Sequence, residues 1–313
     1  MSATQISQQE YLEDLFQGIY TEDEFTELVE SSLHLNALAG DYCKPKETGG
    51  MEEWAIKNHP KAVQSPVYCD WYHGTWQILR LLNMVAVPKW YPFYRDTLAD
   101  ALTRVKRPNV LISAAADYGM LCTLHQAIEY AGVEADITLI DICQSPLQSS
   151  QWYAARHGVS LETRCDNLLS SRIPEDGYDL VVTDEFLTVL KDPDKPTIVN
   201  QWRRILKPGG RLVTTAMLGK PTTMELRESF AAKSRERLKQ YGPQFFPNYA
   251  DLEDKLVADC AQFASFHTRH MLRDVEQIRG LFTDAGFKFQ VLSEVETPGE
   301  CVNPTYSYQI SAF

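Results

Sequence analysis

Small residues connect an apolar run to a helical pattern at residues 110–119, which read VLISAAADYG. A strand that passes into a helix through small side chains lets backbone amides approach a ligand and directs a helix N-terminus at negative charge. Asp141 ends the next apolar run, 22 positions after Gly119. A carboxylate at that place can accept hydrogen bonds from both hydroxyls of a ribose. The two features together predict a site for a ligand that contains a ribose.

Polar residues also follow the next two apolar runs. Asp166-Asn167 come after the third run, and Thr183-Asp184-Glu185 come after the fourth. Each feature alone has a structural explanation: the first loop is a tight turn without a ligand, Asp141 caps a helix, and Asp166 is a turn carboxylate. In an open α/β sheet, however, ligands bind at the carboxyl ends of the strands. Four such features at successive strand ends therefore favour a binding edge.

Apolar runs alternate with helical patterns between residues 106 and 218. The runs cover 109–116, 135–141, 178–183 and 211–217, with a weaker one at 159–164; the helical patterns cover 120–131, 145–157 and 196–206. Strands that alternate with helices of this length indicate a parallel sheet covered on both faces. The fold class expected from this pattern is α/β.

The flanking regions are mainly helical. Before residue 105, Tyr11 to Ile19 and residues 70–86 show helical spacing. After residue 218, two amphipathic helices are expected near 222–240 and 251–266. They are followed by a helix at 272–285 and by apolar runs at 287–295 and 306–313.

The composition limits the partners. The 313 residues include 30 basic and 42 acidic side chains, for a formal charge of −12. Nucleic-acid backbones require clustered Lys and Arg, so no nucleic-acid partner is expected. No apolar run approaches the ~18–20 residues that span a bilayer, and no secretory signal is visible, so no membrane partner is expected either. The seven cysteines lack a CxxC pair, which fits thiols in a reducing cytoplasm; a homodimer is compatible with the composition.

Residues 109–217, together with the tail 272–313, resemble the class I S-adenosylmethionine-dependent methyltransferases. The most specific matches are YDLVVTDEFL at 178–187 and WRRILKPGGRLVTT at 202–215, where the family commonly shows FDLV…L…LKPGGRLV. A further match is IRGLFTDAGF at 278–287. The sequence departs from the family at Ile112, where an acid is frequent, and at Ala114 and Ala116, where glycines are expected. Alanine still permits a close backbone approach.

The resemblance implies S-adenosylmethionine as the cofactor and assigns residues by position. The loop would face the methionine part, Asp141 would hold the ribose hydroxyls, and Asp166 would accept from the adenine amino group. Asp184 or Glu185 would lie near the amino-acid moiety or the acceptor. The cofactor-binding residues expected on this basis are Ser113, Ala114, Ala115, Asp117, Gly119, Asp141, Ile142, Asp166, Asn167 and Asp184.

The resemblance also implies a Rossmann-like sheet of parallel strands with a reversed last strand. Residues 106–218 would form the cofactor-binding core, which 272–313 would complete. Residues 1–105 would be a helical N-terminal cap and 219–271 a helical lid insertion. Methyl transfer from a sulfonium mainly needs an aligned acceptor and exclusion of water, and alignment can supply about 7–11 kcal/mol of the barrier. A general base is needed only for a protonated acceptor or a poor nucleophile.

The richest aromatic stretch contains Tyr68, Trp71, Tyr72, His73 and Trp76. Its functional interpretation is a pocket wall with cation–π contacts and with His73 as a base. Its structural interpretation is the packing of a helix against the core. If one face of this helix lines the acceptor site, Tyr72 and Trp76 bind the substrate together with Glu185, and His73 is the catalytic residue.

Two further patterns have structural explanations. His267 and His270 lie three apart, but no third ligand is identifiable, so no metal site is expected. Cys143 follows Asp141 closely, but nothing near it in the sequence would lower its pKa, so a buried thiol is favoured over a nucleophile.

The pattern as a whole favours a methyltransferase that acts on a small molecule or a peptide side chain by direct in-line transfer, with a specialised metabolite preferred as the acceptor. One alternative is a nicotinamide-dependent oxidoreductase, because a small-residue loop and a distant acid suit both cofactors. The lost glycines, the Lys-Pro-Gly-Gly turn and the reversed tail argue against it. Another is a non-catalytic sensor or partner subunit that binds S-adenosylmethionine. A third uses the same cofactor for a different transfer.

Overall fold

The computed structural model describes residues 26–31, 70–85, 92–219, 222–246, 249–266, 268–297 and 306–313. No helix within these ranges is both long and apolar enough to cross a membrane. The helical face expected between Tyr11 and Ile19 lies outside them, as do Tyr68 and His267.

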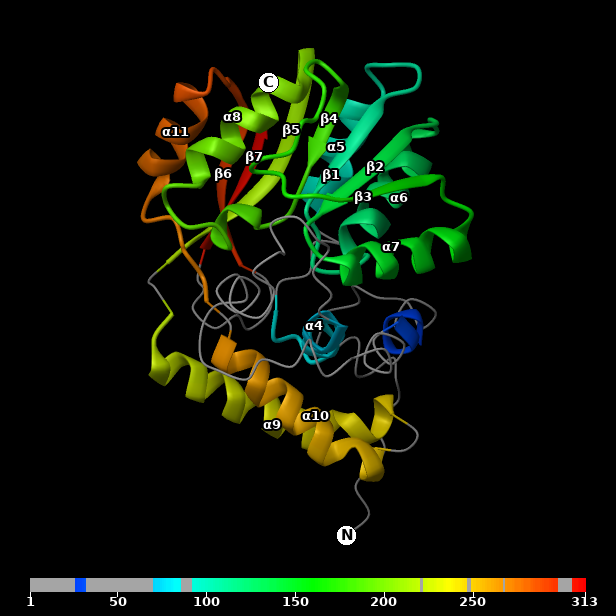
Figure 1. Cartoon of the computed structure of the whole chain (residues 1–313), viewed down its shortest axis with the longest axis vertical. Helices are drawn as coiled ribbons and strands as arrows, with labels where there is room; N and C mark the ends of the chain where they lie inside the picture. The colour runs from blue at the N-terminus through cyan, green and yellow to red at the C-terminus, as the bar shows by residue number, and fades with distance from the viewer. Residues whose placement is uncertain are drawn as a thin grey trace.

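A seven-stranded sheet forms the centre of the molecule (Figure 1). The strands lie side by side in the order β3 (Leu161–Cys165), β2 (Asp136–Asp141), β1 (Asn109–Ser113), β4 (Tyr178–Val182), β5 (Leu206–Leu218), β7 (Tyr306–Ala312) and β6 (Phe289–Glu296). The pairs among β1 to β5 are parallel, whereas β7 runs antiparallel to both of its neighbours. The Rossmann-like fold with a reversed last strand is therefore confirmed.

Helices cover both faces of the sheet. One hydrophobic cluster joins the sheet to α5 (Pro92–Leu102), α6 (Gly119–Ala131) and α7 (Gln144–His157), and the other joins it to α8 (Lys195–Ile205) and α11 (Val275–Asp284). Alternation along β1 divides its side chains between the two, since Val110 and Ile112 enter the first cluster and Leu111 the second. Burial on both faces explains the continuous apolar runs in the sequence.

Strand β5 begins earlier than its apolar run predicts, at Leu206 instead of residue 211. Tyr178 pairs with Leu206, but Leu180 pairs with Arg211, so the Lys-Pro-Gly-Gly segment bulges out of the ladder. Gly209 takes a φ of 80° there, which glycine adopts without strain.

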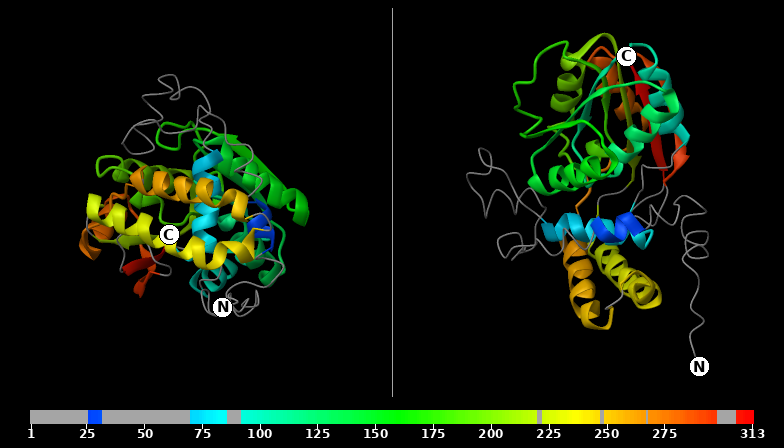
Figure 2. Two further views of the ribbon diagram at one scale, coloured as in Figure 1. Left: turned by 90° about the horizontal axis from the view of Figure 1, so that it is seen from below. Right: turned by 90° about the vertical axis from the view of Figure 1, so that its right-hand side faces the viewer.

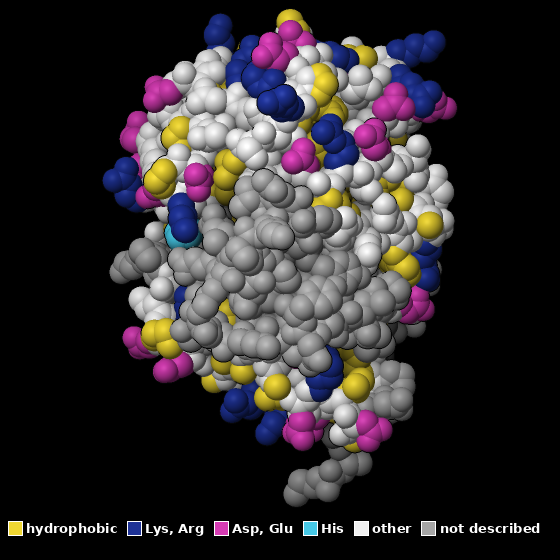
Figure 3. All heavy atoms as spheres, in the orientation of Figure 1, with side chains coloured by type: hydrophobic (Ala, Val, Ile, Leu, Met, Phe, Trp, Pro, Cys, Tyr) yellow, Lys and Arg dark blue, Asp and Glu magenta, His cyan; other side chains and the backbone are white. Residues whose placement is uncertain are grey.

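Three helices lie beyond the carboxyl ends of the parallel strands: α4 (Asp70–Leu81), α9 (Met224–Phe245) and α10 (Tyr249–Phe266). Figures 1 and 2 show α4 between the sheet and the hairpin formed by α9 and α10. The face seen in Figure 3 carries basic and acidic side chains interspersed over the sheet-containing part. From here on, the cap means α4, α9 and α10 together: α4 comes from the expected N-terminal cap, and α9 and α10 come from the expected lid insertion.

Helix α9 continues past its expected end at residue 240, through Gly242 and Pro243 to Phe245. Tyr241 and Phe245 are buried, so burial of the last turn offsets the hydrogen bond that a proline cannot donate. Gly242 lies directly under the ring of Tyr249: a Cβ there would come within 2.1 Å of Tyr249 Cε2. The close approach of α9 and α10 therefore requires glycine at this position.

Replacing Gly242 with alanine is expected to destabilise the fold by about 1–3 kcal/mol, because the tyrosine ring must move out of a packed interface. Gly280 in α11 is the matched control, since a Cβ there meets nothing within 4 Å. Gly280→Ala should stabilise the protein by about 0.5–1 kcal/mol through helix propensity. Thermal unfolding of both variants tests the packing, and a Gly242→Ala protein as stable as the parent would contradict it.

Candidate functional site

The loop after β1 turns sharply at Ala114, whose φ is 65°. Its amide donates to Ile140 O at 2.9 Å, and the next amide, of Ala115, donates to Asp141 Oδ2 at 3.0 Å. A left-handed conformation at a residue with a Cβ costs about 1–2 kcal/mol. The position at which the family resemblance expects glycine is therefore one at which the backbone conformation favours it.

Ala114→Gly is expected to raise stability by about 0.5 kcal/mol, because relief of left-handed strain exceeds the extra entropy of the unfolded chain. Ala116→Gly is the control: Ala116 is not among the residues with positive φ, so glycine there should cost about 0.5–1 kcal/mol. Denaturant titration of both variants measures the difference. Equal destabilisation by the two substitutions would show that Ala114 carries no strain.

Asp141 ends β2 with both carboxylate oxygens on backbone amides. Oδ1 accepts from Cys143 N at 2.7 Å and Oδ2 from Ala115 N, and the residue is 7% exposed. Burial and the charge of Cys143 raise the pKa of Asp141 to about 7, against the opposing effect of the two amides and of His73. Ile142, the next residue, is 45% exposed, so an apolar side chain faces outward beside the acid.

His73, on α4, lies close to Asp141 and to the loop after β1. Its Nδ1 is 2.6 Å from Ala116 O. Burial lowers the pKa of His73, but Cys143, Asp141 and the Ala116 carbonyl outweigh it and raise that pKa to about 9. The ring is then an imidazolium at neutral pH, which donates hydrogen bonds and cannot accept a proton.

Asp117 is also bonded to α4, and it accepts a hydrogen bond from Gly119 in turn. Asp117 forms a buried ion pair with Arg80, and its Oδ1 accepts from Gly119 N at 2.8 Å. Ser113 instead points toward α8, since its Oγ accepts from Trp202 Nε1 at 2.8 Å. The side chains of the loop thus divide between the cap and the core.

Asp166 and Asn167 follow β3 in a turn that they stabilise themselves. Asp166 accepts from Asn167 N at 2.8 Å and from the Ser171 hydroxyl, and Asn167 Oδ1 accepts from Leu169 N at 3.0 Å. The side chain of Asp166 is 40% exposed. Its carboxylate therefore remains open to a further donor.

Asp184 and Glu185 follow β4, beneath the cap. Asp184 Oδ1 accepts from Tyr94 Oη at 2.8 Å and from Thr215 Oγ1 at 2.6 Å. Glu185 has a φ of 52° and is 6% exposed, with Oε1 accepting from Ser307 Oγ at 2.7 Å. Among the described residues, no hydrogen-bond partner reaches Glu185 Oε2.

Burial and the adjacent Asp184 raise the pKa of Glu185 to about 8, while Ser307 and Arg269 oppose the shift. Burial raises the pKa of Asp184 too. A carboxyl that titrates near neutrality can both accept and return a proton.

Aromatic rings of the cap pack together, and one of them lies under Arg269, which also acts electrostatically on Asp184 and Glu185. Tyr72 stacks on Phe263 with ring centroids 4.6 Å apart, and Trp76 lies 6.1 Å from the same ring. Arg269 is 5.5 Å above the Trp76 ring, donates to Thr188 Oγ1 at 3.0 Å and is only 7% exposed. Tyr72 and Trp76 thus belong in part to the packing of the cap, as the structural interpretation expects.

Sequence reasoning missed Arg80 and Arg269. The one local signal for Arg269 is its position between His267 and His270, and that pair of histidines suggests metal binding and gives no sign of a role for the arginine. Among the described residues, no cluster of three potential metal ligands exists.

Residues 120–210 match the family described as a methyltransferase domain. The matched segment runs from α6 to β5, between the loop after β1 and the reversed tail. This part of the core is therefore similar to a methyltransferase domain. Methyltransferases of this fold use S-adenosylmethionine.

Several solved structures are similar to this chain at low identity. A methyltransferase from Methanosarcina mazei is 19% identical, with 72% of this chain and 97% of that chain covered and a TM-score of 0.46. An O-methyltransferase from Nostoc punctiforme, described as putative, is 16% identical over 80% of this chain and 62% of its own length, with a TM-score of 0.47. A 1,6-didemethyltoxoflavin N1-methyltransferase from Burkholderia thailandensis is 14% identical, covers 71% and 77%, and has a TM-score of 0.44. Among the curated proteins there is no match.

The residues at the sheet edge fit this cofactor. Ala114 to Ala116 carry only methyl groups where a ligand must approach the backbone, Asp141 supplies a carboxylate, and Ile142 supplies an exposed apolar surface beside it. The set suits a nucleoside whose ribose meets the acid and whose base meets the isoleucine.

The affinity of the site for S-adenosylhomocysteine is expected to depend on the protonation of Asp141. Below a pKa of about 7 the carboxyl is protonated and loses acceptor capacity, so the affinity should fall by up to about tenfold per pH unit. The contribution of Asp141 to the stability of the free protein should move in the opposite direction. Because its folded pKa lies above the unfolded one, that contribution is fully present at low pH and is lost as the pH rises to about 7.

Calorimetric titration between about pH 5.5 and about pH 8 measures the pH dependence of affinity. Within the described ranges, the titratable groups that interact with Asp141 include His73, Cys143 and Cys165. Asp141→Asn is the control and should bind weakly with a flat profile over this range. The same slope in parent and variant would assign the titration to another group.

Proposed function

We propose that the chain methylates a small molecule bound beneath the cap, through an amine or hydroxyl group placed beside Glu185. The observation that carries the proposal is the buried Glu185 Oε2, which has no partner within the described ranges. A buried carboxylate oxygen without a donor is costly, and a ligand that supplies the donor removes this cost.

S-adenosylmethionine, when bound, supplies a methyl group on a positively charged sulfur that is already activated for transfer. The chain contributes binding and alignment: Asp141 would hold the ribose, Ile142 and Asp166 would hold the base, and Asp184 would bind near the amino-acid moiety. The cap excludes water and limits the acceptor to one orientation, which lowers the barrier by removing motional freedom.

In this proposal Glu185 takes the acceptor's proton in its deprotonated form, which has a free oxygen and becomes more populated as the pH rises through its pKa of about 8. His73 as the base remains a prediction, although its raised pKa of about 9 and its contact with Ala116 O favour a role in holding the cofactor loop. Tyr72 and Trp76 would form the wall of the acceptor site. The sequence predicts a specialised metabolite as the acceptor and a cytoplasmic location, and both remain predictions.

Glu185→Gln is expected to lower turnover by about 100-fold at saturating cofactor, since the amide cannot take a proton. Its affinity for S-adenosylhomocysteine should stay within about twofold of the parent. The assay uses S-adenosylmethionine with a panel of primary amines and phenols, and mass spectrometry detects both the methylated product and S-adenosylhomocysteine. Glu294→Gln is the matched control, because Glu294 is exposed on β6.

Full activity of Glu185→Gln, together with loss of activity in His73→Gln, would transfer the role of base to His73. Binding of the adenosyl ligand without turnover on any probe would favour the non-catalytic alternative. Binding of NADH instead would favour the oxidoreductase.

A further inference from the structure

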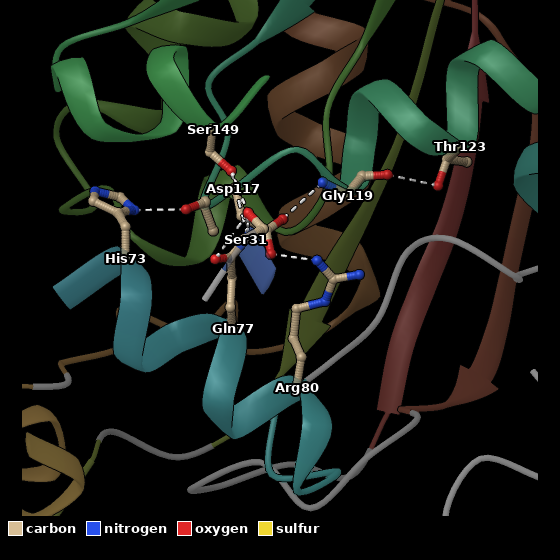
Figure 4. A network of polar contacts seen from close by, with 9 residues as sticks. Ser31, His73, Gln77, Arg80, Asp117, Gly119, Thr123 and Ser149 are labelled. Carbon is tan, nitrogen blue, oxygen red and sulfur yellow. Dashed lines mark hydrogen bonds and ion pairs between the residues drawn. The ribbon is translucent and has the colours of Figure 1, made fainter. Parts of the chain in front are cut away.

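Helix α4 of the cap contacts the cofactor loop through two side chains on one face. Figure 4 shows His73 and Arg80 reaching from α4 toward the loop, with Gln77 between them. His73 bonds Ala116 O, and Arg80 forms the ion pair with Asp117. Two consecutive loop residues are thus held from the cap and not from the sheet.

The ion pair of Arg80 and Asp117 is fully enclosed. The two side chains are 1% and 5% exposed, and the guanidinium also lies 5.7 Å from the Tyr118 ring centroid. A buried carboxylate that loses its partner is strongly disfavoured, so Asp117 cannot keep this position as an anion without Arg80.

Gly119 completes the contact. Its amide donates to Asp117 Oδ1, and a Cβ in its place would lie 2.9 Å from that oxygen and 3.0 Å from Arg80 Nη1. Gly119 is also the first residue of α6. The ion pair therefore fixes the point at which the loop enters the helix.

Gln77 anchors the middle of α4. Its Nε2 donates to Ser31 Oγ at 2.9 Å and to Ser149 Oγ on α7 at 3.3 Å. All three residues are buried. This contact ties α4 to the core at a point separate from the loop and so supports His73 and Arg80.

We propose that Arg80 is a positioning residue for the cofactor: through Asp117 it holds the loop 114–119 in the shape that binds S-adenosylmethionine. The inference rests on the proposed function in that the cofactor lies against this loop. It follows that cofactor binding and docking of α4 on the loop are linked: docking of α4 raises the affinity for the cofactor, and bound cofactor favours docking of α4 by the same factor. His73 assists at the adjacent residue.

A double-mutant cycle on S-adenosylhomocysteine affinity tests the proposal. Arg80→Met and Asp117→Asn should each weaken calorimetric binding by about 10- to 100-fold, a coupling of ordinary size. The variant that carries both should bind about as well as Asp117→Asn alone, because Arg80 acts through Asp117. Arg80→Lys, which keeps the charge, should recover most of the affinity.

Arg237→Met is the control for general damage to the cap. Arg237 donates to Leu82 O and to Asn83 O, just beyond the end of α4, and does not contact the loop. It should lower the melting temperature and leave the affinity within about twofold of the parent. Losses that multiply in the double variant, or an Arg80→Met protein that behaves like Arg237→Met, would overturn the proposal.

Hydrogen exchange of the unaltered protein supplies a test that needs no variant. Binding of S-adenosylhomocysteine should slow exchange of the α4 amides as well as those of the loop. Unchanged exchange in α4 on binding would contradict the linkage. Failure of the unaltered protein to bind the nucleoside at all would refute the cofactor site itself, which is a separate outcome.

Discussion

Burial of carboxylates at the carboxyl edge of the sheet is the constraint on which the site depends. Asp117, Asp141 and Glu185 are between 4% and 7% exposed, because the cap covers the ends of β1, β2 and β4. A buried anion needs charge or hydrogen bonds in place of water. Each acid is compensated differently: Asp117 by Arg80, Asp141 by two amides beside the His73 ring, and Glu185 by Ser307 on one oxygen and by the charge of Arg269. The incomplete compensation at Glu185 is what indicates an acceptor there.

The cap therefore does more than shield the sheet edge from water. Its helix α4 supplies the cation for the cofactor loop, and Arg269, which lies over the Trp76 ring of α4, acts electrostatically on the acids after β4. The geometry of the loop and the burial of the acids are properties of one packed unit. A substitution in α4 can thus change cofactor affinity although the helix lies outside the segment that matches the methyltransferase family.

The periodicity of the sequence was enough to predict the sheet, because strands buried on both faces leave continuous apolar runs, as at 110–112 and 180–182. The polar residues at the strand ends could be predicted as well, because each follows directly after an apolar run. The side chains that bond these residues could not be predicted. Arg80 meets Asp117 across 37 positions, and Arg269 bonds Thr188 across 81, so no local pattern marks either. Ser113 shows the reverse, since its place in the loop predicted a ligand contact while its hydroxyl bonds Trp202 in the core. The roles assigned to the site residues remain predictions.

A crystal structure of the protein with S-adenosylhomocysteine is the most direct test of the central claim that the edge formed by β1, β2 and β4 holds the cofactor beneath the cap. The account predicts ribose hydroxyls on Asp141, adenine against Ile142 and toward Asp166, and sulfur directed at Glu185, with the pair of Arg80 and Asp117 intact. A nucleoside bound elsewhere, or bound here with Asp141 free of the ribose, would contradict it.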